Sequence, residues 1–185
     1  MQVVEAWYDE LPLNLWVLQS WDMTFKDGKN NDYVVGLVAG RRGSDIYLMD
    51  RVKGQWDFPE TCRQFLALRR KYARTRESLV EETANGAAVI STLKHRVSGV
   101  VAVHPEGGKV SRAHAAQPWV EGGNVYLPNP LPHGALLPGR EWVEDFLHQL
   151  LAFPHGAHDD DVDAFTQLVA RCAQPVPRVL KSVSW

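Results

Sequence analysis

Acidic side chains occur at three places in the chain where they could bind divalent cations. Asp22 and Glu81 each end a short apolar stretch, and Asp159, Asp160 and Asp163 belong to the run HDDDVDA, which precedes another apolar stretch. Hard cations such as Mg²⁺ prefer oxygen ligands and are commonly held by a few carboxylates together with water and phosphate oxygens. Two such ions, about 3.5–4 Å apart, can activate a water and stabilise the leaving oxygen during phosphodiester cleavage. These residue types therefore allow metal-dependent phosphodiester cleavage if the fold brings the three places together.

The aspartate run also has a purely structural interpretation. Aspartates at a helix N-terminus cap free amides, and each gains about 0.3–1 kcal/mol from the helix dipole at low salt. That effect accounts for one or two of the aspartates in the run, but not easily for all four. Asp160 and Asp163 are spaced to share one helix face. His155 and His158 have HxxH spacing, but without a third soft ligand they form only a weak zinc motif.

The periodicity of the chain predicts the elements that would position these acids. Apolar residues that alternate or run continuously predict strands, and apolar residues at helical spacing predict helices. Asp57 is the predicted N-cap of the first helix, with Pro59 in its first turn. The predicted strands are 15–23, 33–40, 46–50, 78–82, 99–104 and 122–128. The predicted helices are 58–72, 85–96, 109–118, 140–153 and one from the aspartate run to about 172, with turns or loops at 26–32 and 128–139.

This order of elements predicts an α/β fold. We expect a central mixed sheet of five or more strands, three antiparallel and then two parallel, flanked by helices. If the strand at 77–82 returns beside the first strand, Glu81 lies near Asp22, and Glu82 is the alternative acid. We expect residues 1–14 to form a linker-like lead-in, 15–173 to form the α/β domain and 174–185 to form a C-terminal tail.

The composition limits the class of protein. The chain has 185 residues, 45% hydrophobic and 23% charged, which suits one folded domain with a single sizeable core. No apolar run approaches the roughly 20 residues that span a bilayer, and the first residues lack the basic start of a secretory signal. Cys62 and Cys172 are the two cysteines and have no CxxC spacing, so a disulfide scaffold is not expected.

Positive charge is concentrated in two segments although the net charge is only −2. Six arginines and lysines fall between residues 63 and 76, and Lys94, His95 and Arg96 follow, whereas acids concentrate at 159–163. Such segregation is compatible with a nucleic-acid contact, and equally with a solvated basic helix face.

Four segments carry a resemblance to a known family. They are SWDMTFKDGKNNDYVVGLVAG, VEETANGAAVISTL, HPEGGKVSRAHAAQPWVEGGNVYLP and HDDDVDA. In this order and spacing they resemble the nuclease domain of the large terminase subunit of tailed bacteriophages, a member of the ribonuclease H-like superfamily. The resemblance extends over residues 15–172 and implies a ribonuclease H-like fold. It also implies a DNA endonuclease that cleaves concatemeric viral DNA during genome packaging, with two Mg²⁺ or Mn²⁺ ions.

The resemblance assigns roles to the acids. Asp22 matches the first-strand aspartate that contacts both metals, and Glu81 matches the acid that opens the family's E-[DE]-x-A-x-G stretch. Asp159 and Asp160 match the pair at the third metal-binding position, with Asp160 favoured as the direct ligand and the order left open. Asp163 matches a further, supporting acid.

The resemblance also assigns roles beside the acids. Lys109 and Arg112 match the family's G-x-K-x-x-R segment, which implies a phosphate contact near the metals, although an exposed basic turn is the alternative. Asp161 falls where the family varies and is expected to face water. His158 is a possible partner of a metal ligand. The implied partners are double-stranded DNA, the ATPase motor domain of the same full-length protein, the small terminase subunit and the portal protein, in the cytoplasm of the infected bacterial host.

The chain departs from the family in one respect. Large terminases carry a P-loop ATPase before the nuclease, and no GxxxxGK[ST] occurs here, so we expect an excised C-terminal domain or a truncated relative without ATPase activity. Two other functions stay open. One is a different ribonuclease H-like nuclease, such as a junction resolvase. The other is a catalytically silent DNA- or protein-binding module of the packaging machine.

Overall fold

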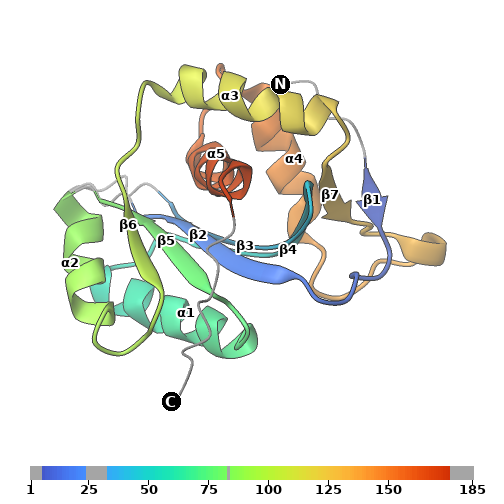
Figure 1. Ribbon diagram of the computed structural model, residues 1–185. Coiled ribbons are helices and arrows are strands. Elements are labelled where there is room, and N and C mark those ends of the chain that lie inside the picture. Colours follow the sequence, from blue (N-terminus) through green and yellow to red (C-terminus); the bar gives the residue numbers. More distant parts are fainter. Residues whose placement is uncertain (1–5, 24–32, 83, 176–185) are drawn as a thin grey trace, which may run out of the picture.

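A single mixed sheet organises the part of the chain that the computed structural model describes, residues 6–23, 33–82 and 84–175. Its strands lie in the order β1-β7-β4-β3-β2-β5-β6. The strands are β1 (Trp7–Tyr8), β2 (Trp16–Asp22), β3 (Val34–Arg42), β4 (Asp45–Gly54), β5 (Glu77–Glu81), β6 (Val100–Val103) and β7 (Val125–Pro128). The helices are α1 (Phe58–Lys71), α2 (Ala84–Leu93), α3 (Lys109–Glu121), the short 3-10 turn η1 (Pro132–Gly134), α4 (Trp142–Ala152) and α5 (Asp160–Ala173). Helices α1 and α2 cover one face, and α3, α4 and α5 cover the other (Figure 1).

The pairing of the strands confirms the predicted centre of the sheet. Strands β2, β3 and β4 are antiparallel, while β5 pairs parallel with β2 and β6 pairs parallel with β5. Strand β7 adds a further parallel pair with β4, and β1 pairs with β7. The interpretation of residues 1–14 as a linker therefore fails for Trp7 and Tyr8, which belong to the sheet.

Two apolar cores fill the layers on either side of the sheet. Alternate residues of β3 supply both: Val35 and Leu37 face the core under α3–α5, whereas Val34 and Val38 face the core over α1 and α2. Burial on both faces explains the near-continuous apolar run of this strand. Gly36 is required beside Trp21, because a Cβ atom on Gly36 would lie 2.7 Å from the indole ring.

The helix ends largely follow the sequence. The Asp57 carboxylate caps α1 by accepting a 2.8 Å hydrogen bond from the Glu60 amide. Helix α3 passes through Pro118 to Glu121, beyond the predicted end. Proline cannot donate a hydrogen bond from its own nitrogen, but its carbonyl still accepts one from the Gly122 amide, and the helix continues for one further turn. The predicted turn at 26–32 and residues 176–185 of the tail lie outside the described residues. None of the helices in the described part is long and apolar enough to span a membrane.

Candidate functional site

The predicted carboxylates gather at one end of the sheet, which we name the acidic edge: Asp22, Glu81, Asp159, Asp160 and Asp163. Asp22 is the last residue of β2, and Glu81 is the last residue of the neighbouring parallel strand β5. Because the residues just before them, Trp21 and Val80, pair directly, both strands end at the same level. Asp22 is buried, with 5% of its surface exposed, and Glu81 is half-buried.

Helix α5 brings the aspartate run onto β2. The Ser20 hydroxyl donates a 2.7 Å hydrogen bond to the Ala164 carbonyl, and the Gln167 amide donates to the Ser20 hydroxyl at 2.9 Å. Asp160 and Asp163 lie seven and four residues before Gln167, so the three side chains share one helix face. The hydrogen bonds of this face to β2 therefore hold the first turn of α5 at the acidic edge, where Asp160 and Asp163 are buried.

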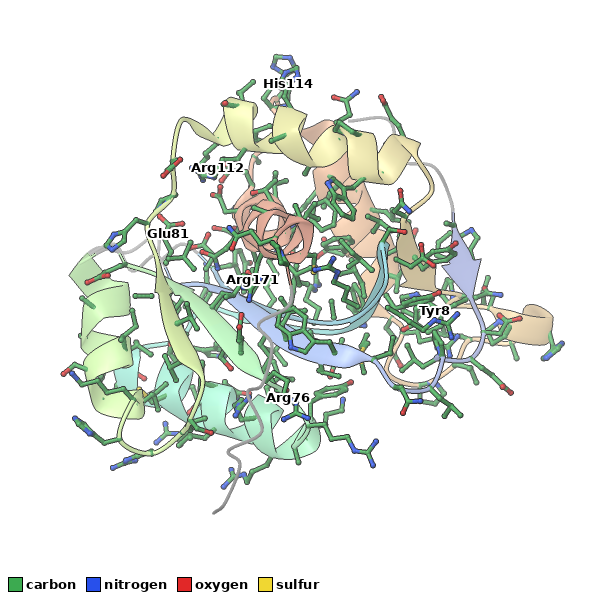
Figure 2. All side chains as sticks on the ribbon, viewed as in Figure 1. Tyr8, Arg76, Glu81, Arg112, His114 and Arg171 are labelled. Atoms are coloured by element: carbon green, nitrogen blue, oxygen red, sulfur yellow. The ribbon has the colours of Figure 1, made fainter. Side chains whose placement is uncertain are left out.

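Two cations of α3 lie against the same turn. The Lys109 ammonium is 2.8 Å from Asp159 Oδ1 and 2.7 Å from Asp163 Oδ2. The Arg112 guanidinium donates to Asp163 Oδ1 at 2.6 Å. Figure 2 shows Arg112 on the side of α3 that faces α5, while His114 projects outward. Asp159, at the N-cap position of α5, uses its carboxylate for Lys109 and caps no amide.

The charged groups of the acidic edge and α3 shift the pKa values of Glu81 and Lys109. Burial raises the pKa of Glu81, the nearby Asp163 carboxylate raises it further, and Arg112 and Lys109 partly oppose the rise. Burial alone would lower the pKa of Lys109, but its bonds to Asp159 and Asp163 prevail and hold that pKa above its ordinary range. Lys109 therefore stays charged and serves as a counter-ion for the aspartates.

A groove opens beside the acidic edge. It has a volume of about 760 Å³ and lies between strands β5 and β6 and helices α3 and α5. Glu81, Arg112 and Asp163 line it at the acidic edge, and Trp119 and Arg171 line it further along. In Figure 2, Arg171 lies between α5 and the sheet. The groove gives solvent and an extended ligand access to the carboxylates.

The acidic edge has the donor chemistry of a hard-cation site but not its geometry. Carboxylate oxygens are the ligands that Mg²⁺ and Mn²⁺ prefer. Yet within the described ranges no three histidine, cysteine or acidic side chains are placed to hold one metal ion. Lys109 occupies oxygens of both Asp159 and Asp163, so these carboxylates do not fit an ion in this arrangement.

The expectation that Asp161 faces water is wrong. Its side chain is fully buried, and Asp161 Oδ2 lies 2.8 Å from the Arg51 guanidinium and 3.2 Å from the Lys53 ammonium. Arg51 also contacts Asp145 of α4 at 2.7 Å. Burial raises the pKa of Asp161, and both cations counteract that rise. This ion cluster joins the first turn of α5 to β4 and α4.

Sequence reasoning missed Arg51 and Lys53 as residues that position α5. Their signal is two cations at alternate positions in the strand segment IYLMDRVKG, which places both on one face of β4. His158 is exposed, and its ring makes an edge-to-face contact with Tyr33 at 5.3 Å between centroids. His155 is also exposed.

Solved structures of large terminases have a similar fold. The large terminase nuclease from the thermophilic phage G20c, with bound zinc, aligns with a TM-score of 0.62 and 17% identity over 91% of this chain and 86% of that chain. The same nuclease with bound magnesium gives a TM-score of 0.61 at 17% identity over the same shares. The large terminase from a second thermophilic bacteriophage gives a TM-score of 0.66 at 11% identity, and the aligned part is 90% of this chain but only 42% of that one.

The sequence comparisons point the same way. A search of curated proteins gives no match. The family model described as the terminase RNaseH-like domain matches residues 19–171, which includes the end of β2 with Asp22, all of β5 and nearly all of α5. The mixed sheet with helices on both faces is thus a ribonuclease H-like fold, as the sequence predicted. The chain belongs to the terminase RNase H-like domain family.

Proposed function

We propose that this domain is a metal-dependent DNA endonuclease that cleaves concatemeric viral DNA during genome packaging. The observation that carries the proposal is the meeting of Glu81, Asp163, Lys109 and Arg112 at the ends of parallel strands, beside an open groove. Carboxylates suit divalent ions, and the two cations suit the phosphates of a DNA strand. The family supports a nuclease, because the matching G20c structures are of a terminase nuclease.

The proposed cofactor is a pair of Mg²⁺ or Mn²⁺ ions. The ligands would be Asp22, Glu81 and Asp159 or Asp160, with Asp163 in support. The G20c nuclease was solved with zinc and with magnesium, which supports a divalent ion at this fold. Bound there, such ions would polarise the phosphate and lower the pKa of a water.

Binding of ions would require Lys109 to leave the aspartates. The ammonium is tethered by a flexible side chain that is 48% exposed, so it can move without unfolding α3. Lys109 and Arg112 would then contact DNA phosphates at the acidic edge. Such contacts are expected to weaken as salt rises.

The wider assembly follows from the family. We propose double-stranded DNA as substrate and the ATPase motor domain of a full-length large terminase as the covalent partner, since the alignment covers only 42% of the large terminase from the second thermophilic bacteriophage. The small terminase subunit and the portal protein are the further proposed partners. The setting would be the cytoplasm of an infected bacterium.

Nicking of supercoiled plasmid in Mn²⁺ tests the nuclease activity. The Asp22→Asn variant keeps the size of the side chain but removes the charge. Loss of a mere partner of a metal ligand costs about 10–100-fold, so we expect loss of this proposed ligand to lower the nicking rate at least about a hundredfold. The Asp9→Asn variant is the matched control, because Asp9 is exposed and lies near β1, away from the acidic edge. Equal residual cleavage by the wild type and Asp22→Asn would refute the assignment of this site.

The same assay separates the rival functions. A four-way junction cut in preference to linear duplex would favour a resolvase-type nuclease. Duplex binding without any metal-dependent cleavage would favour a silent DNA-binding module.

A further inference from the structure

Five cations form an exposed surface at the end of the sheet opposite the acidic edge, which we name the cationic underside: Arg70, Arg74, Arg76, Lys94 and Arg96. All five are exposed, and none forms an ion pair with a carboxylate of the described residues. The neighbouring Arg63 and Lys71 differ, because they pair with Glu60 and Asp50. Charges without a carboxylate partner are available to an external anion.

The cationic underside is one continuous surface although its residues come from two parts of the chain. Arg69 donates to the carbonyls of Thr75 and Ser98, which ties the end of α1 to the loop after α2. The Arg76 carbonyl lies so close to Gly99 that a Cβ atom there would be 2.2 Å from it. Arg96 is near enough to Cys62 of α1 to lower the pKa of its thiol, against the larger effect of burial.

The position of this surface separates it from the proposed cleavage site. Arg76 precedes the first residue of β5, and Glu81 is the last residue of that strand. Four residue steps of strand span roughly 13 Å between the two ends. In Figure 2, Arg76 lies on the α1 side of the sheet, whereas Glu81 and Arg112 lie at the acidic edge under α3.

We propose that the cationic underside is a second duplex-DNA contact, which binds phosphates outside the cleavage site. The inference rests on the proposed function for its substrate. Residues 61–76 and 83–105 contain no Asp or Glu, so nothing within these segments opposes a polyanion. None of the large hydrophobic side chains that are exposed in the described residues belongs to the cationic underside or to the loop after α2. Protein interfaces need an apolar centre, whereas sequence-independent phosphate binding needs only cations.

Two matched charge removals test the proposal in the Asp22→Asn background, where DNA stays intact. The test variant is Arg74→Gln with Arg96→Gln, and the control is Arg42→Gln with Arg63→Gln, which removes two exposed charges that are not among the five, one of them already paired with Glu60. Affinity for a 30-base-pair duplex is measured by fluorescence anisotropy from 50 to 200 mM salt. Each phosphate contact contributes about 0.9 to the slope of log affinity against log salt. We expect the test pair to reduce the magnitude of that slope by about 1.8, which means a weaker salt dependence, and the control pair to leave the slope unchanged.

Each alternative result overturns the inference. Equal changes of the slope in both pairs would show a general effect of net charge. An unchanged slope in the test pair would show that this surface does not contact DNA and would favour an acidic protein as its partner. Absence of any duplex binding would overturn this inference as well. Thermal unfolding of each variant checks that the fold is retained. The test pair is also made in protein that retains Asp22 and is assayed for plasmid nicking. Nicking tests the nuclease assignment, whereas the salt slope tests the second DNA contact, so the two proposals can fail independently.

Discussion

The Lys109 ammonium lies 2.7 Å from Asp163 Oδ2, so the acidic edge carries its own counter-ion. The same ammonium contacts Asp159, and Arg112 holds the other oxygen of Asp163. Repulsion within the aspartate run is therefore relieved by side chains of α3. A divalent ion at this place would compete with Lys109 for the carboxylates.

The Lys109→Met variant tests that competition. Methionine keeps most of the length of the side chain and removes the charge. Partly exposed ion pairs are each worth about 0.2–1 kcal/mol, so loss of two of them should strengthen Mn²⁺ binding about two- to thirtyfold. Isothermal titration calorimetry measures the change, and Lys71→Met, which breaks the exposed pair with Asp50, is the control. Weaker Mn²⁺ binding by Lys109→Met would contradict the competition.

The buried ion cluster of Asp161 predicts a large loss of stability on substitution. Asp161→Asn leaves the Arg51 and Lys53 charges, both about one-tenth exposed, without their buried counter-ion. Removing one partner of a buried pair costs about 3–5 kcal/mol, and we expect a loss near the lower end because Asp145 still contacts both cations. Urea unfolding measures the free energy of unfolding.

Asp145→Asn is the control for the same cluster. The Asp145 side chain is 54% exposed, so its removal should cost less than about 1 kcal/mol. Equal losses for Asp145→Asn and Asp161→Asn would mean that burial does not set the contribution of Asp161.

Local and topological rules predicted the parts of the fold that depend on nearby residues. The cap at Asp57 is a three-residue pattern, and its hydrogen bond to Glu60 is present. Strand β5 lies beside β2, a placement that the order of elements offered only as a hypothesis, and this pairing brings Glu81 level with Asp22. The alternation of β3 likewise follows from its apolar sequence.

Two of the failed predictions depend on partners far away in the sequence. Asp161 was expected to face water because it falls where the family varies, but its partner Arg51 is 110 residues upstream. Trp7 and Tyr8 form a strand only because β7 supplies the other half of the pairing. The alternation of a strand and the cap of a helix depend on residues nearby in the sequence. They do not identify a partner that is far away in the chain, and the structure was needed to find it.

The raised pKa of Glu81 predicts how stability depends on pH. Burial raises the folded-state pKa above the ordinary value of 4.5. Between these two pKa values the folded state binds more protons than the unfolded state, so the free energy of unfolding falls as pH rises. Glu81→Gln should remove this pH dependence. The free energy of unfolding of the variant, relative to that of the wild type, should therefore increase with pH between the two pKa values and level off above the higher one.

Thermal unfolding in EDTA between pH 4 and 7 measures the difference for Glu81. Glu144→Gln, which removes an exposed acid on α4, is the control for the loss of one carboxylate. A constant difference between Glu81→Gln and the wild type at all pH values would contradict a raised pKa.

The bond between Ser20 and the Ala164 carbonyl predicts a link between β2 and the function of α5. Ser20→Ala leaves the buried Ala164 carbonyl and the Gln167 amide without this hydroxyl, at a cost of about 1–3 kcal/mol. Because the same helix face carries Asp160 and Asp163, the rate of plasmid nicking should fall as well. Ser78→Ala is the matched control, since Ser78 is also buried in the sheet but makes only a 3.5 Å contact with Gln19 and none with α5. If both alanine variants nick plasmid equally fast once their folding is confirmed, this hydrogen bond does not position the acidic edge.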